Sequence, residues 1–373
     1  MLLTGASVAA CGRVAAVRPE ADGSVVEMPD GSEHPDGGAG AAETNAVGED
    51  GAVEDAGAAD AGHGAGGALD AGRAIDAGSS TQARPADAGS GPPYPIVLAH
   101  GFSGWSSIGP IEYFYEVPEA LRADGHDVHV AQVDPYADSF TRGAELLEFV
   151  QRVLAQTGAA KVDIIAHSQG GLDARYVAHA LPSGVAAIAM LATPNHGTAV
   201  ADDALEGMGG SDGPAQQILD FLFDVAGTTP PGLGAATWQL SSAGAAEFNA
   251  KIPDAPGVAY FSMAGRSNLQ HARAACQAAE PAFISRWDPY VDPVRPSLLA
   301  GAILLAGDPF DPTPNDGLVA VESTRWGTFL GCIPADHLDE IGQFLGQPPG
   351  PGNPFDYLDF YRGLASWLVA RGF

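Results

Sequence analysis

The hexapeptide AHSQGG, residues 166–171, decides how this sequence is interpreted. It follows the apolar run 162–166 and precedes a helical pattern at 172–180, so Ser168 lies on a predicted turn between a strand and a helix. Such a turn needs small neighbours because the backbone is crowded there, and Ala166 stands where the usual pattern has glycine. Ser168 is therefore either an activated nucleophile or an ordinary turn residue, and the rest of the chain must separate these interpretations.

Strand and helix patterns alternate on both sides of this motif. Alternation of this kind predicts an α/β fold with a mostly parallel central sheet, helices on both faces, and ligands bound at the carboxyl ends of the strands. The β-favouring runs are 94–99, 127–133, 162–166, 185–192 and 258–264, and helical patterns cover 141–156, 172–180 and a segment between Pro118 and Gly125.

Composition divides the 373-residue chain near residue 93. Residues 1–93 contain no Phe, Trp or Tyr and consist largely of Gly, Ala, Asp, Glu, Ser and Pro, so they cannot bury enough apolar surface to offset the entropy of ordering. We expect a leader and a disordered linker there. An acidic calcium-binding repeat is the alternative, which the irregular Asp-Ala-Gly intervals disfavour. Residues 94–373, about 280 in number, suffice for one α/β domain with a sizeable core.

Charge and hydropathy exclude some partners. The formal net charge is −29, with 17 Lys and Arg against 46 Asp and Glu, which argues against nucleic acid or an anionic membrane as the main partner. The sequence also lacks an apolar run long enough to cross a bilayer.

The first residues, MLLTGASVAACG, resemble a bacterial lipobox that ends at Cys11. We expect export, to a secreted or outer-surface location, with possible lipid anchoring through Cys11; the alternative is a chance cysteine in a leader without a charged start. Setting Cys11 aside leaves Cys276 and Cys332, which could pair in an oxidising compartment. Their loop of some 55 residues corresponds to about 4 kcal/mol in the chain-entropy description.

A nucleophilic serine needs a histidine base that a carboxylate orients. In α/β hydrolases the chain order is serine, acid, histidine, which favours Asp316 in TPNDGLV and His337 in ADHLDE. Both lie late in the chain and in predicted loops. We interpret the other candidates after Ser168 as structural, namely His179, His196 and His271.

Two backbone amides can hold the oxyanion of such a reaction. The N–H of Gln169 opens the helix after Ser168, and the N–H of Phe102 lies in the loop after the strand 94–99. We interpret His100, in the same loop, as a buried histidine bonded to backbone rather than a catalytic one.

Five motifs, LAHGFSGW, AHSQGGLDARYVA, LATPNHGT, PNDGLV and DHLDEI, resemble in this order the secreted bacterial triacylglycerol lipases of the Pseudomonas and Burkholderia type. The resemblance runs from about residue 94 to the last residue. It implies an α/β-hydrolase fold, ester hydrolysis at a lipid interface, and a triad of Ser168, Asp316 and His337. It also implies that the oxyanion is held by the amides of Phe102 and Gln169.

The same resemblance implies a structural calcium ion beside the loop of the catalytic histidine. Asp339 and Asp292 match the family's ligands, with the backbone carbonyls of Gln343 and Gln347 filling the shell. Asp288 is the rival of Asp292, and solvated loop carboxylates are the alternative for all three. The resemblance further implies a disulfide between Cys276 and Cys332, and it raises a dedicated foldase as a partner.

A lid is expected between residues 201 and 236. The segment PAQQILDFLFDVAG, residues 214–227, carries more apolar side chains than one buried face needs, which suits a lid that opens at an interface. A core helix is the alternative.

The sequence thus predicts a serine hydrolase that cleaves lipid esters, most simply a triacylglycerol lipase. A carboxylesterase, a polyester depolymerase or an acyltransferase could use the same triad. A hydrolase-like binding module on a surface tether is the non-enzymatic alternative, which a complete triad disfavours.

Overall fold

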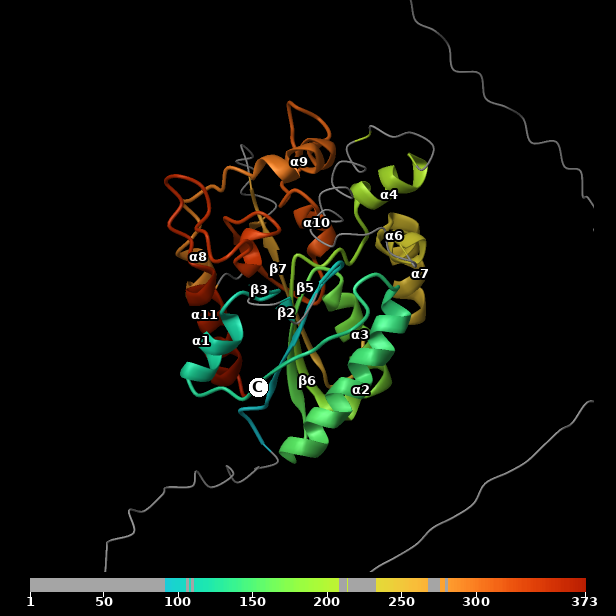
Figure 1. The fold of residues 1–373 in the computed structure, drawn as a ribbon, viewed down its shortest axis with the longest axis vertical. Helices are drawn as coiled ribbons and strands as arrows, with labels where there is room; N and C mark the ends of the chain where they lie inside the picture. Colours follow the sequence, from blue (N-terminus) through green and yellow to red (C-terminus); the bar gives the residue numbers. More distant parts are fainter. Residues whose placement is uncertain are drawn as a thin grey trace, which may run out of the picture. The chain divides into compact units, whose positions relative to one another are not determined.

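Six parallel strands form the central sheet of the computed structural model (Figure 1). The structure describes residues 91–104, 107–108, 111–207, 213, 233–267, 276–278 and 281–373. All of them lie in the unit Gly78–Phe373. The strand order is β4-β1-β5-β6-β7-β8, so every neighbour from β5 onward is also the next strand in sequence. The strands are β1 (Ile96–Ala99), β4 (Val128–Val130), β5 (Val162–His167), β6 (Val185–Leu191), β7 (Ala259–Gly265) and β8 (Thr328–Ile333).

The strands of the sheet centre are apolar and buried because helices cover both faces, as a parallel sheet requires. Every residue of β5 and β6 is buried. On one face α2 (Ser139–Thr157) and α3 (Gly170–Ala180) pack beside each other, and on the other lie α1 (Val117–Ala123), α8 (Ala282–Ser285) and α11 (Tyr357–Ala370) (Figure 1). The predicted α/β architecture is confirmed.

Local signals explain where the helices begin and end. The Asp138 carboxylate caps α2 by accepting the N–H groups of Phe140 and Thr141, and Gly158 ends the helix in the left-handed region. Pro118 opens α1, where its missing N–H costs nothing. The strand β8 and the helix α11 were not predicted, nor was the small antiparallel pair β2 (Ser107–Ile108) and β3 (Ile111–Glu112).

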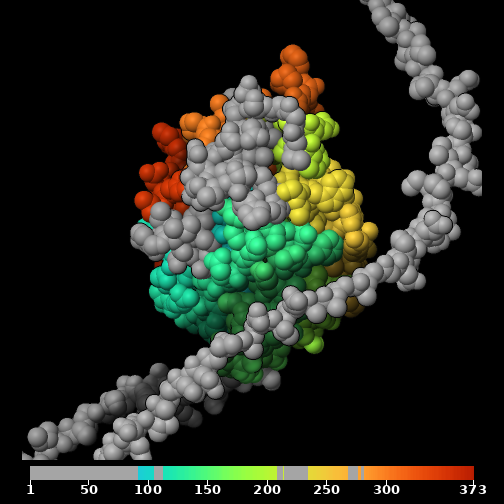
Figure 2. All heavy atoms as spheres, turned by 45° about the vertical axis from the view of Figure 1, so that its right-hand side comes forward, coloured from blue at the N-terminus to red at the C-terminus, as the bar shows by residue number. Residues whose placement is uncertain are grey.

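The remaining helices lie toward the carboxyl ends of the strands or beside them (Figure 1). Among the described residues, none of the helices combines the length and the apolarity that a membrane span requires. The segment that contains α9 projects from the folded unit, where it is coloured orange in Figure 2. These helices are α4 (Ala199–Glu206), α6 (Leu233–Leu240), α7 (Ser242–Lys251), α9 (Leu299–Ala306) and α10 (Val321–Thr324), with single 3₁₀ turns at Pro182–Gly184, Pro296–Leu298 and Asp339–Ile341.

Most of the expected lid, 201–236, lies outside the described residues, including all of the apolar segment 214–227. Its two described flanks are α4 and α6. The leader, the linker through residue 90 and Cys11 also lie outside the described residues.

Candidate active site

Ser168 lies on a strained turn between β5 and α3. Its φ is 55°, in the left-handed region that non-glycine residues rarely adopt, and its N–H donates to the carbonyl of Leu191 on β6. The surrounding glycines are needed for space: a Cβ on Gly101 would lie 2.6 Å from the Cβ of Ser168, and one on Gly170 would lie 2.4 Å from the carbonyl oxygen of Ala99. The turn therefore has the geometry that projects a serine hydroxyl above the sheet.

Asp316 and His337 form a hydrogen-bonded pair. Nδ1 of His337 lies 2.8 Å from Oδ2 of Asp316, and both side chains are buried. The other carboxylate oxygen of Asp316 accepts the N–H groups of Leu318 at 2.8 Å and Val319 at 2.7 Å. The His337 N–H also donates to the backbone carbonyl of Asp316 at 3.0 Å. These bonds fix the orientation of the imidazole and commit its Nδ1 to the Asp316 carboxylate.

Ser168 and His337 line the same pocket, which contains about 560 Å³ of empty space including its open mouth. Its walls are mainly apolar, and they come from α4, α6 and the loop that follows Asp316. An apolar cleft beside a serine and a histidine suits the hydrocarbon part of an ester. The other lining residues are Phe102, Pro194, Thr198, Val200, Ala201, Ala204, Thr237, Leu240, Leu318 and Val319.

The two expected oxyanion donors lie beside this serine. Phe102 is in the loop after β1 and lines the pocket, and Gln169 is the N-cap residue of α3. His100 is buried, with Nδ1 2.9 Å from the Gly101 carbonyl and Nε2 3.3 Å from the Val133 N–H. Its neutral form satisfies both contacts, with Nδ1–H as donor and Nε2 as acceptor, which agrees with the structural interpretation of this histidine.

A buried arginine, which the sequence did not reveal, fixes the loop that follows β1. Arg142 on α2 donates from Nη2 to the His100 carbonyl at 2.6 Å and from Nη1 to the Asp134 carbonyl at 2.9 Å. Its Nε donates to Oδ2 of Asp173 on α3 at 2.8 Å, and neither side chain is exposed to solvent. Burial raises the pKa of Asp173 to about 6, although Arg142 opposes that shift.

A second buried network, also missed, lies behind His337. The Tyr113 hydroxyl is 2.7 Å from Nδ1 of His167, and Nε2 of His167 is 2.8 Å from Oε2 of Glu340. The rings of His167 and His337 are 4.5 Å apart between centroids. Burial and the neighbouring His337 hold the pKa of His167 well below its usual range, while burial and the nearby carboxylates, Asp316 foremost, raise that of Glu340. Neutral His167 fits between a hydroxyl donor and a carboxyl acceptor.

Three buried aspartates surround the other side of the His337 loop. Oxygens of Asp292, Asp336 and Asp339 lie within 4.8 Å of one another, so they could hold a metal ion. Burial, with Asp336 and Asp339 nearby, raises the pKa of Asp292 to about 8. The structure brings Asp292 rather than Asp288 to this cluster, and it adds Asp336, which the sequence analysis did not include.

Gln343 and Gln347 follow the aspartate cluster in the same loop. The Gln343 side chain is buried and donates from Nε2 to the carbonyls of Glu112 and Tyr113, whereas Gln347 is exposed. These bonds tie the loop after His337 to the segment that supplies Tyr113.

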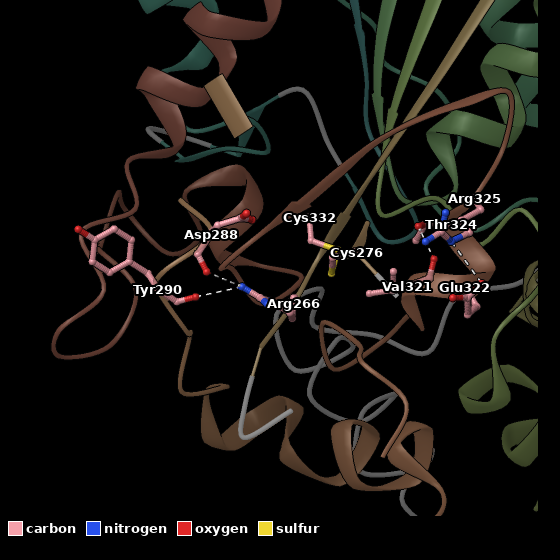
Figure 3. Close-up of a disulfide and its surroundings, with 9 residues drawn as sticks. All are labelled: Arg266, Cys276, Asp288, Tyr290, Val321, Glu322, Thr324, Arg325 and Cys332. Atoms are coloured by element: carbon pink, nitrogen blue, oxygen red, sulfur yellow. Dashed lines mark hydrogen bonds and ion pairs between the residues drawn. A yellow bond between two sulfur atoms is a disulfide. The ribbon is translucent and has the colours of Figure 1, made fainter. Parts of the chain in front are cut away.

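Cys276 and Cys332 are joined by a disulfide with a Cα–Cα distance of 5.4 Å (Figure 3). Cys332 is on β8, five residues before His337. Nearby, Nη2 of Arg266 donates to the carbonyls of Asp288 at 3.3 Å and Tyr290 at 3.2 Å (Figure 3). The contact of Asp288 with Arg266 is therefore made by the backbone carbonyl of Asp288.

The remaining histidines agree with a structural interpretation where they are described. Nδ1 of His179 is 3.3 Å from the Pro253 carbonyl, and Nε2 of His196 is 3.2 Å from that of Arg325. His271 lies outside the described residues.

Comparison with known proteins agrees with this geometry. Residues 94–211 match the alpha/beta hydrolase fold family. A triacylglycerol lipase of Vibrio cholerae is 32% identical over 277 residues, which cover 68% of this chain and 81% of the relative. A triacylglycerol lipase of Burkholderia plantarii is 31% identical over 309 residues, which cover 72% of this chain and 84% of the relative. EstA from Clostridium botulinum shares the fold, with a TM-score of 0.51 at 19% identity over 75% of this chain and 88% of EstA. The chain therefore belongs to the triacylglycerol lipases of the α/β-hydrolase fold.

Proposed function

We propose that this lipase cleaves lipid esters through an acyl-enzyme on Ser168, with His337 as the base and Asp316 as the orienting acid. The observation that carries the proposal is the 2.8 Å contact between His337 and Asp316, made while His337 and Ser168 line one apolar pocket. Separate parts of the chain supply the three residues, and their convergence is not expected of a structural turn serine.

In the proposed reaction, Nε2 of His337 takes the hydroxyl proton of Ser168 as Oγ attacks the ester carbonyl carbon. The amides of Phe102 and Gln169 hold the resulting oxyanion. Collapse of the tetrahedral intermediate breaks the bond to the alcohol, which leaves with the proton from His337. Water, deprotonated by the same imidazole, then releases the fatty acid and restores Ser168.

Asp316 holds the imidazole in the required tautomer and stabilises its charged form. The apolar walls from α4 and α6 would contain the acyl chain, which favours a lipid substrate over a polar ester. We further propose that the segment 201–236 forms the lid.

We also propose that Asp292 and Asp339 hold a calcium ion, with the carbonyls of Gln343 and Gln347 completing the shell. The donor set fits: the ligands are hard oxygens, and Oδ2 of buried Asp292 has no hydrogen-bond partner among the described residues. When bound, the ion would cross-link the segment of Asp292 to the loop of His337.

Export to an oxidising compartment is proposed from the disulfide. Residues 1–93 are proposed as leader and linker, with Cys11 as a lipidation site and a dedicated foldase as a folding partner.

Ser168→Ala tests the mechanism. We expect at least a roughly 10⁴-fold loss of ester hydrolysis, because the nucleophile is removed while the amide donors stay. Hydrolysis of an emulsified triacylglycerol and labelling by a fluorophosphonate would be measured together, with the melting temperature as the folding control. Retained turnover or labelling at wild-type stability would disprove the role of Ser168.

A further inference from the structure

A guanidinium lies inside the aspartate cluster. Nε of Arg295 contacts both carboxylate oxygens of Asp336, at 3.1 and 2.9 Å, and its Nη2 contacts Oδ1 of Asp339. The Arg295 side chain is about one-fifth exposed, whereas Asp336 is fully buried. Since Asp336 and Asp339 flank His337, this arginine joins its own segment to the catalytic loop on both sides of the histidine.

The three carboxylates differ in how many of their oxygen atoms already accept hydrogen bonds. Oδ1 of Asp336 accepts the N–H groups of Leu338 at 3.0 Å and Asp339 at 2.9 Å, and Oδ2 accepts the Arg295 N–H at 3.0 Å. Asp336 is therefore committed to backbone and guanidinium. Oδ2 of Asp292, by contrast, is buried without a hydrogen-bond partner among the described residues. A carboxylate oxygen of Asp292 also lies within 4.8 Å of oxygens of the other two aspartates.

The charge of the cluster follows from these contacts. Three carboxylates and one guanidinium leave two negative charges when all are ionised. That charge equals what one divalent cation neutralises, and the buried setting makes a mismatch of even one charge costly.

We propose that Arg295 is a resident cation of this cluster, which neutralises Asp336, holds Asp339, and sets the residual charge to that of one divalent ion. Arg295 then keeps the His337 loop in shape when calcium is scarce, and it weakens calcium binding by repelling a second cation. The proposal rests on the calcium site proposed above, which it deepens, and its test does not depend on the catalytic role of His337.

The test is a series of variants that changes the charge of the cluster in single steps. Arg295→Gln leaves three negative charges, Asp336→Asn leaves one, and the double variant keeps two. Calcium affinity of the full chain, stripped with EGTA and titrated with calcium chloride in a calorimeter, should rise roughly tenfold in Arg295→Gln and fall by a similar factor in Asp336→Asn. The double variant should bind as the wild type does.

Thermal unfolding supplies the second readout. In EGTA, Arg295→Gln should melt below the wild type, and calcium should raise its melting temperature by more than it raises that of the wild type. Arg286→Gln, which removes an exposed arginine paired with Asp359, is the matched control and should leave the calcium increment unchanged.

Equal calcium affinities in the wild type, Arg295→Gln and Asp336→Asn would overturn the proposal, as would weaker binding in Arg295→Gln. If Arg295→Gln folds only with calcium, the resident-cation role is supported directly. If Arg295→Gln folds in neither buffer, the calcium affinities of Asp336→Asn and the double variant decide the outcome. The proposal requires the double variant to bind calcium more tightly than Asp336→Asn does. Neither readout involves ester turnover, so the result is independent of the Ser168 assay.

Discussion

His100 illustrates how burial controls a single residue beside the active site. Its two nitrogens bond to backbone groups on either side, and burial, aided by the positive charge of Arg142, lowers its pKa from 6.5 to about 3. The folded protein therefore keeps this histidine neutral at pH values where the unfolded chain takes up a proton. Its contribution to stability is present above pH 6.5 and is lost as the pH falls toward 3.

Replacing His100 should flatten the acid limb of the stability curve. Between pH 6 and pH 4, the free energy of unfolding of the wild type should fall faster than that of His100→Gln by about 1.4 kcal/mol per pH unit. Urea unfolding at each pH measures the two slopes. Equal slopes would mean that His100 is protonated in the folded state.

The site residues that could be predicted from the sequence are those whose adjacent residues form a recognisable motif. Ser168, Asp316 and His337 each lie in a short motif, and the order of the motifs separates His337 from other histidines. Arg295 and Glu340 carried no such signal, because their partners Asp336 and His167 are 41 and 173 positions away in sequence. Only the fold brings such pairs together.

At the scale of elements, the pair α2 and α3 shows how two helices position a loop that belongs to neither. Arg142 reaches across from α2 to Asp173 on α3 and to the carbonyl of His100. Removing the arginine leaves a buried carboxylate without its counter-ion, which is more damaging than removing both.

We therefore expect Arg142→Met to lower the free energy of unfolding by about 3 to 5 kcal/mol. The double variant Arg142→Met, Asp173→Leu should be more stable than Arg142→Met alone, since the unpaired carboxylate is gone. Urea unfolding at pH 8 provides the comparison. The single variant Asp173→Leu completes the comparison. If the losses of unfolding free energy in Arg142→Met and Asp173→Leu simply add in the double variant, then the ion pair does not couple the helices.

Strand prediction succeeded for the strands at the centre of the sheet and failed at β8. The runs that became β5 and β6 are buried along their whole length, which is the pattern of a central parallel strand. The strand β8 begins exposed at Thr328 and contains Gly331, and its pairing with β7 shifts register, so periodicity carries little signal. The position of β8 follows from its pairing with β7, which the sequence alone does not show.

On the scale of the whole molecule, the helix that packs behind one wall of the pocket carries exposed apolar side chains. Leu305 of α9 packs against Val200 and Ala204, two residues of the pocket wall. On the same helix Ile303 is 63% exposed, and Phe310 just beyond it is 95% exposed. A lipase that works on aggregated lipid needs such a surface near its pocket, and patches of this kind mark interaction sites.

Ile303→Ser and Phe310→Ser should each slow hydrolysis of emulsified triacylglycerol roughly tenfold, because each removes one large side chain from the lipid contact. Hydrolysis of a soluble short-chain ester should stay at the wild-type rate. Val369→Ser, at the end of α11 and also exposed, is the matched control. A parallel loss on both substrates would point instead to damage within the pocket.

The three residues of the proposed triad are dispersed along the chain, which sets the order in which they are synthesised. The nucleophile follows β5, whereas the acid lies beyond β7 and the base beyond β8, so translation delivers Ser168 well before its partners. A ribosome-bound chain that has reached β7 carries an elbow serine with no base to activate it. On the proposed mechanism, ester hydrolysis therefore begins only after the final strand has been synthesised and has joined the sheet.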